Sequence, residues 1–244
     1  MVEAELKADL NVLFGQLNLS KITTGLLVDY ALEYTDLALF SGVISNENAV
    51  NMSVWLNIYK TVYSAKINNQ INLTNPENVF LGIENAANAK SAVPLAMLHY
   101  RYDRFNDNAV QNGWLAYTKG QLWEVQNKPS PYEQRDVFAI TPAKFIFESN
   151  TLAFEFDSNL FFRNNSLQIS GLYMKFEETG AWVQANWNQP VTHTFAGDGK
   201  KTIQFKSVGR FRFWQLSALV LQRTGGLFSR RQSDRTRIDD GRRA

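Results

Sequence analysis

Hydrophobic residues in the first half of the chain recur mainly at helical spacing. Amphipathic helices are predicted over residues 3–16, 49–66 and 76–90. The third begins at Asn75-Pro76-Glu77, where an Asn cap, a Pro at the first helical position and an acidic first turn favour a helix start. Its buried face is expected to hold Val79, Phe80, Ile83 and Ala87.

Four shorter segments of this half have the length of strands. The apolar runs 26–28 and 93–100 predict buried strands, with Pro94 near the start of the second. Residues 114–117 and 121–125 flank Thr118-Lys-Gly120 and predict a hairpin. The first half is therefore expected to be a mixed, helix-rich unit.

After Pro129 and Pro131 the hydrophobic period changes from 3.6 to 2. Short apolar segments alternate with turn residues such as Asp157-Ser-Asn159, which predicts a β-sandwich. The expected strands are 137–140, 144–147, 152–156, 167–169, 172–176, 182–185, 191–195 and 202–205. Within them, Val191, Phe195, Ile203 and Phe205 are expected to be buried.

The change of period predicts an α+β chain of two domains. A mixed helical domain would occupy residues 1–128, and a Pro-containing linker would occupy 129–136. An antiparallel sandwich would follow over 137–207. This division also predicts that a protease cuts near 126–136 and leaves two resistant pieces.

Charge is distributed unevenly along the chain. Residues 1–207 hold 16 basic and 20 acidic side chains, whereas residues 208–244 hold nine arginines, three aspartates and no lysine or asparagine. This reversal predicts that 208–244 is a disordered tail or a frame artefact outside the evolved domain, with 229–244 too charged to bury. Because the body is acidic, no nucleic-acid partner is expected.

Composition excludes several chemical classes. The chain has no cysteine and two histidines, so thiol catalysis and cysteine-ligated metals are ruled out. No apolar run has the roughly 18–20 residues that a membrane-spanning helix needs, and the N-terminus lacks the pattern of a signal peptide. No P-loop, dinucleotide fingerprint or EF-hand loop occurs.

Leu172–Phe205 resembles a PKD domain, an Ig-like sandwich of extracellular proteins. Leu172-Tyr-Met-Lys-Phe176 leads into the expected turn, and Val191-Thr-His193-Thr-Phe195 with Gly199 supplies the following strand and turn. Glu177-Glu178 and Lys201 depart from the family pattern. Lys21–Tyr30 resembles the opening region of large secreted proteins of Bacteroidetes-type bacteria, and the resemblance implies an extracellular or cell-surface location.

Both histidines are candidates for acid–base or ligand chemistry, and each has a structural alternative. His193 alternates with apolar residues, which favours a packed histidine. His99 lies beside Tyr100, Asp103 and Arg104 at the end of a predicted strand. This position fits either an active-site residue or a structural histidine that is hydrogen-bonded in a cluster at the edge of the sheet. No G-x-S-x-G motif supplies a nucleophile.

Three carboxylate pairs raise the question of glycosidase chemistry, which needs two acids across a cleft. They are Glu177-Glu178, Glu133/Asp136 and Glu155/Asp157. A turn at 177–178 would instead allow a calcium site with Asp157 or Asp198. The aromatic residues Trp114, Tyr117, Trp123, Trp182 and Trp187 suggest either a sugar-stacking platform or core packing.

These observations assemble no catalytic set, so no catalytic, cofactor-binding or metal-binding residue is assigned. The predicted function is a non-catalytic structural or interaction module of a larger secreted or cell-surface bacterial protein. Its partners would be neighbouring domains, surface proteins or polysaccharides. The alternatives are the N-terminal part of a secreted hydrolase whose catalytic domain lies beyond residue 244, and a carbohydrate-binding module.

Overall fold

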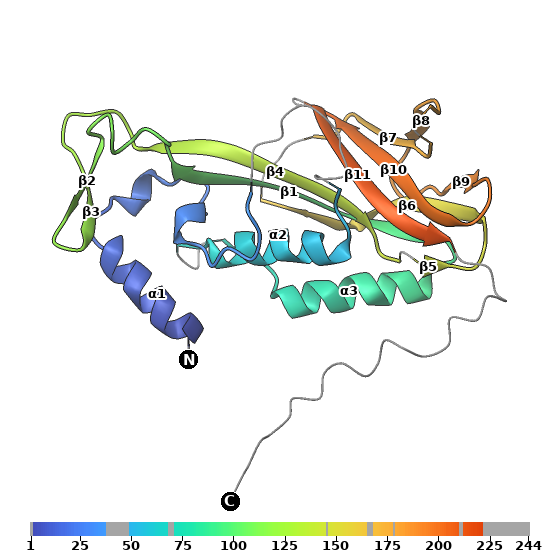
Figure 1. The fold of residues 1–244 in the computed structure, drawn as a ribbon, viewed down its shortest axis with the longest axis horizontal. Helices are drawn as coiled ribbons and strands as arrows, with labels where there is room; N and C mark the ends of the chain where they lie inside the picture. The colour runs from blue at the N-terminus through green and yellow to red at the C-terminus, as the bar shows by residue number, and fades with distance from the viewer. Residues whose placement is uncertain are drawn as a thin grey trace, which may run out of the picture.

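The computed structural model is a mixed α+β structure in which helices cover one face of a curled sheet (Figure 1). The residues that it describes are 2–37, 49–67, 71–144, 146–164, 168–177, 179–209 and 212–221. Among these, no helix is long and apolar enough to cross a membrane.

The helices form where the hydrophobic period predicts them. They are α1 (Val2–Leu13), α2 (Met52–Ser64) and α3 (Pro76–Ala89). Asn75 caps α3 by accepting from the backbone N–H of Glu77 at 2.8 Å. One expected inward residue is wrong, because Phe80 is 36% exposed although Val79, Ile83 and Ala87 are buried.

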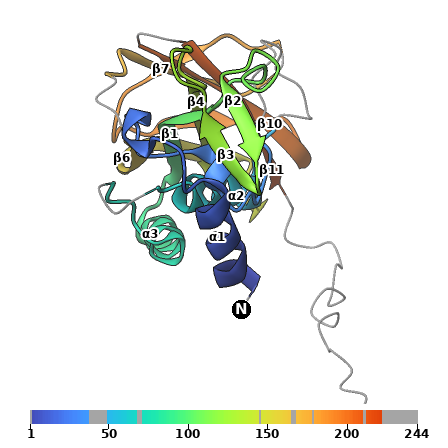
Figure 2. The same cartoon turned by 90° about the vertical axis from the view of Figure 1, so that its left-hand side faces the viewer.

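The strands form two mixed sheets and a separate hairpin. The first sheet has the order β4 (Tyr132–Pro142), β1 (Val93–Phe105), β6 (Thr151–Arg163) and β9 (Val191–Thr194). The second has the order β5 (Ile146–Phe147), β11 (Arg212–Leu221), β10 (Gly199–Val208), β7 (Gly171–Lys175) and β8 (Val183–Ala185). The hairpin is β2 (Leu115–Thr118) with β3 (Gln121–Glu124), and it projects from the end of the molecule near α1 (Figure 2).

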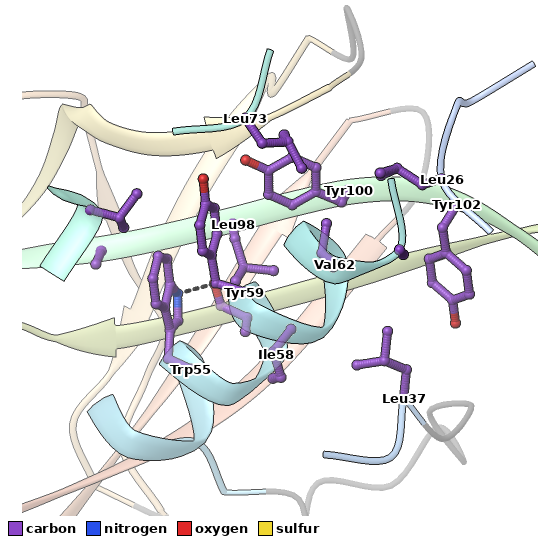
Figure 3. Packing of buried hydrophobic residues seen from close by; sticks show 14 of the residues in the cluster. Leu26, Leu37, Trp55, Ile58, Tyr59, Val62, Leu73, Leu98, Tyr100 and Tyr102 are labelled. Atoms are coloured by element: carbon purple, nitrogen blue, oxygen red, sulfur yellow. Dashed lines mark hydrogen bonds between the residues drawn. The ribbon is translucent and has the colours of Figure 1, made fainter. Parts of the chain in front are cut away.

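Strand β1 contributes side chains to two hydrophobic cores. Leu98 and Tyr100 point towards α2 and α3, whereas Leu95 and Met97 point between the two sheets. In the first core, Trp55 and Tyr59 of α2 lie side by side against the sheet (Figure 3). Trp55 Nε1 donates to the carbonyl oxygen of Ala139 in β4 at 3.3 Å, which fixes the helix on the sheet.

Strand β1 pairs with strands on the far side of the predicted linker. β1 lies before residues 129–136, whereas its neighbour β4 begins within that range at Tyr132 and its neighbour β6 lies after it. The β1–β4 register nevertheless runs from Leu95↔Pro142 to Phe105↔Tyr132, and β6 pairs with the other edge of β1. Residues on both sides of 129–136 therefore share one sheet, and an independent two-domain Ig sandwich is not what the strand order shows.

Part of the predicted C-terminal tail forms a strand. Residues 212–221 form β11, which pairs with β10 from Gly199↔Leu221 to Val208↔Arg212 and also pairs with β5. Residues 222–244, including the charged segment 229–244, lie outside the described residues. Residues 212–221 are therefore an ordered strand, and the interpretation of 208–244 as a frame artefact stays a prediction.

Three other local predictions have distinct outcomes. Residues 26–28 are buried but form isolated bridges and a short 3-10 turn, not a strand. The turn expected at Asp157-Ser-Asn159 is a bulge inside β6, since β1 advances two residues from Leu95 to Met97 while β6 advances five. Phe195, Ile203 and Phe205 are buried as expected, whereas Val191 is half-buried.

Candidate functional site

The candidate site lies where β1 changes its neighbour. β6 pairs with β1 as far as His99↔Arg163. Four residues further along β1, Asp103 pairs with the N-terminal segment instead, and its N–H donates to the carbonyl oxygen of Leu26 at 2.8 Å. Sites where neighbouring chain segments diverge from a strand leave a crevice that is suited to ligands.

A cavity of about 620 Å³ occupies this place. Its walls come from the N-terminal segment, the chain before α3, and strands β1, β4 and β6. The lining residues are Thr23, Thr24, Ile71, Asn72, Leu73, Arg101, Gln134, Arg163 and Asn164. Among the described lining residues, two are arginines and none is acidic, so this part of the lining is positively charged and rich in amide and hydroxyl groups.

Arg101 is held in place by its neighbours on both sides. Its Nε lies 3.4 Å from Asp136 Oδ1 on β4. On the other side, β6 has ended at Arg163, and the side chain of Asn164 makes hydrogen bonds to the main chain of Arg101 in place of a strand backbone. The side chain of Arg101 remains 31% exposed, so its guanidinium can also face a ligand.

Arg163 has a different support. It is the last residue of β6, and its guanidinium lies 4.9 Å from the centroid of the Phe161 ring. This cation–π contact helps to orient the charge of Arg163 at the end of the strand. The two arginines therefore reach the cavity from neighbouring strands.

His99 is placed beside this site but does not enter it. β1 continues to Phe105, so His99 lies inside the strand and is 1% exposed. His99 Nε2 lies 2.9 Å from Asp136 Oδ1. Burial of Asp136 acts to raise its pKa, but the His99 hydrogen bond and the Arg101 charge outweigh burial and lower that pKa. The prediction that His99 lies at the edge of the sheet is wrong, and the prediction that its side chain is hydrogen-bonded is confirmed.

The paired carboxylates are held by cations and do not face one another across a cleft. Glu155 and Asp157 are both buried, and Lys90 at the end of α3 forms ion pairs with both, at 2.9 Å for Asp157. Glu133 forms an ion pair with Arg135, whereas Asp136 contacts His99 and Arg101. Each pair thus has a structural function.

His193 packs as the alternation predicts. Its ring stacks on Phe176 with centroids 4.4 Å apart, and its Nε2 lies 3.8 Å from Glu177 Oε1. Glu178 lies outside the described residues. Within the described ranges, no three His, Asp or Glu side chains gather as a metal site would require, so the calcium arrangement with Asp157 or Asp198 is not formed there.

The five candidate aromatic residues do not form one platform. In the hairpin, Ala116 pairs with Trp123 and Tyr117 pairs with Leu122, so Tyr117 and Trp123 point to opposite faces. Trp187 lies far along the chain and stacks on Phe161 with centroids 5.4 Å apart. These residues are packed in the core or exposed at separate places, and they do not form a shared sugar-stacking surface.

The sequence did not reveal Arg101 and Arg163 as site residues. A compositional signal was present, because only four arginines occur in residues 1–207 and two of them line one cavity. Their proximity depends on the parallel pairing of β1 with β6, which joins residues more than 60 positions apart. No local pattern encodes that pairing.

Comparisons with known proteins leave the family open. No family model matches the chain, and no curated protein or solved structure is significantly similar to it.

Proposed function

We propose that this chain is a non-catalytic interaction module of a larger secreted or cell-surface bacterial protein, and that it binds an acidic saccharide in the Arg101–Arg163 cavity. The observation that carries the proposal is the pair of guanidinium groups in a polar cavity whose described lining residues include no acid. The volume of about 620 Å³ is in the range of small-ligand sites.

The chemistry of the lining favours a carboxylate attached to a hydroxyl-rich body. A guanidinium presents a planar fork of N–H groups that matches the two oxygens of a carboxylate. Gln134, Asn72 and Thr23 add donors and acceptors suited to sugar hydroxyls. A uronic acid combines both features in one residue.

The surrounding structure supports binding over catalysis. The groups best suited to acid–base work near the cavity, His99 and Asp136, are bonded to each other. Glu155 and Asp157 are neutralised by Lys90. These contacts stabilise the sheet and leave the arginines as the charged groups that face the cavity.

The test is a titration of the full chain with an oligomer of galacturonic acid and with the neutral galactose oligomer, followed by NMR or calorimetry. Binding of the acidic oligomer alone is expected. Arg163→Gln is expected to weaken it about tenfold or more, since a charge-assisted pair contributes about 1.5–3 kcal/mol.

Lys200→Gln is the matched control, because it removes one positive charge from an exposed position of β10 outside the cavity. It should leave the affinity unchanged. Equal binding of the neutral oligomer, or an equal loss in Arg163→Gln and Lys200→Gln, would overturn the assignment.

A further inference from the structure

A second cavity, of about 530 Å³, lies between the helices and away from the arginine cavity. Residues from α1, the segment 32–34, α2 and the start of α3 surround it. They are Lys7, Leu32, Tyr34, Lys60, Tyr63, Ser64, Lys66, Asn75, Pro76 and Glu77. Among these described residues are three lysines and one glutamate, so this lining carries a net positive charge in an acidic body.

The lysines face aromatic rings in this cavity. Lys66 Nζ lies 3.9 Å from the centroid of the Tyr63 ring, and Lys60 Nζ lies 5.7 Å from that of Tyr34. Neither Lys60 nor Lys66 has a carboxylate within 4.0 Å in the part of the chain that the structure describes. Both lysine side chains are half-buried, so a bound anion would interact with ammonium groups that are partly removed from water.

Lys7 has a structural role at the same place. Its Nζ donates to the carbonyl oxygens of Tyr30 at 2.8 Å and Ser64 at 2.5 Å, and it lies 4.0 Å from the Tyr30 ring centroid. These contacts tie α1 to the end of α2. Lys7 therefore adds a fixed positive charge to the wall.

Two further features define the ligand. The cavity includes the first residues of α3, a 14-residue helix whose N-terminal end attracts negative charge. Leu32, Pro76, Tyr34 and Tyr63 add apolar or aromatic surface to a lining that also includes Ser64 and Asn75. The ligand must therefore combine an anion with a flat or apolar ring.

We infer that this lysine–tyrosine cavity binds a phosphate or sulfate monoester of a ring compound. Lysine ammonium groups bind phosphate and similar oxyanions as point charges. The oxyanion lies among the lysines at the start of α3, and the ring lies against the tyrosines.

The experiment is a titration of the full chain with phenyl phosphate, phenyl sulfate, inorganic phosphate and benzyl alcohol, followed by NMR. Phenyl phosphate or phenyl sulfate is expected to bind more tightly than either inorganic phosphate or benzyl alcohol. Comparison of the two esters identifies which oxyanion is preferred. Lys60→Gln and Lys66→Gln are each expected to weaken the preferred ester about three- to tenfold.

Lys128→Gln is the matched control, since Lys128 is exposed in the turn after the hairpin and outside the cavity. Circular dichroism melts verify that each variant is folded. No binding of either ester at about 10 mM, or unchanged affinity in folded Lys60→Gln and Lys66→Gln, overturns the inference. Arg163→Gln should not affect this binding, so the two cavities are tested separately.

Discussion

The side-chain amide of Asn164 hydrogen-bonds to both main-chain groups of Arg101. The N–H of Arg101 donates to Asn164 Oδ1 at 2.9 Å, and Asn164 Nδ2 donates to the Arg101 carbonyl oxygen at 2.7 Å. The amide thereby extends the β1–β6 pairing by one position after β6 ends at Arg163. It also sets the backbone that presents Arg101 to the cavity.

Asn164→Ala should therefore destabilise the chain by about 1–3 kcal/mol, because it leaves two half-buried backbone groups without their partners. The measurement is the free energy of unfolding in denaturant. Asn78→Ala is the control, since Asn78 is an exposed residue of α3 and its loss should change stability by less than about 0.5 kcal/mol. Equal effects of the two changes would show that the amide pairing contributes nothing.

Phe195→Ala should cost roughly 3–5 kcal/mol, as the loss of a buried aromatic side chain does. Phe195 is 3% exposed and contacts the rings of Phe154 and Phe176 at centroid distances of 6.4 and 6.1 Å. Thr192→Ala in strand β9, which ends immediately before Phe195, is the control, because Thr192 is exposed. A loss below about 1 kcal/mol for Phe195→Ala would mean that β9 does not bury this face.

Local patterns predicted the elements whose signals lie within a few residues. The Asn75-Pro76 start of α3 depends on a cap and a fixed φ, and both act on adjacent residues. The alternation of His193 and Phe195 predicted which side chains of β9 and the following residue point towards the core, because strand alternation also depends on neighbouring residues. The hairpin turn at Lys119 and Gly120 also follows from neighbours, since both residues have positive φ.

Predictions failed where distant residues determine the structure. Asp157 reads as a turn residue, yet it is buried within β6 because Lys90 neutralises it. The prolines at 129 and 131 do end a segment, but the chain then returns as β4 along β1. The cavity between Thr24 and Arg163 depends on the change of partner along β1, for which the sequence holds no local sign.

The free energy of unfolding should fall on acidification, in part because Asp136 becomes protonated. The contacts with His99 and Arg101 lower its folded-state pKa below the ordinary value of 3.8, despite the opposing effect of burial. A lowered pKa contributes stability that is present above 3.8 and is lost as the pH falls through the folded-state value. Denaturant titrations at several pH values should show a shallower acid loss for Asp136→Asn than for the parent chain.

Asp103 should change stability with pH in the opposite direction to Asp136, and the same titrations can detect this. Burial raises its folded-state pKa above 3.8, although its hydrogen bonds from Thr24 oppose the shift. Its contribution is therefore present below 3.8 and is lost as the pH rises through the folded-state value. Asp103→Asn should gain stability relative to the parent chain as the pH rises in this window. The same sign of change in both variants would contradict these assignments.

The shared sheet predicts that the chain unfolds as one unit. Residues 127–130 are exposed, so a protease should cut there, as the prolines already suggested. The two pieces should nevertheless remain together on gel filtration, because β4 and β6 stay paired with the two edges of β1. The measurement is gel filtration of the nicked chain, together with thermal unfolding followed by far-UV and near-UV circular dichroism, which should give coincident transitions.

A fragment of residues 1–128 provides the decisive comparison. It keeps the three helices and β1 but loses both neighbours of β1, so Leu98 and Tyr100 lie in a strand with two open edges. Trp55 also loses its hydrogen-bond acceptor on Ala139. The fragment should therefore show no cooperative near-UV transition. Cooperative melting of this fragment, with separation of the two nicked pieces, would instead show that 1–128 is an independent domain and that the pairing across 129–136 is weak.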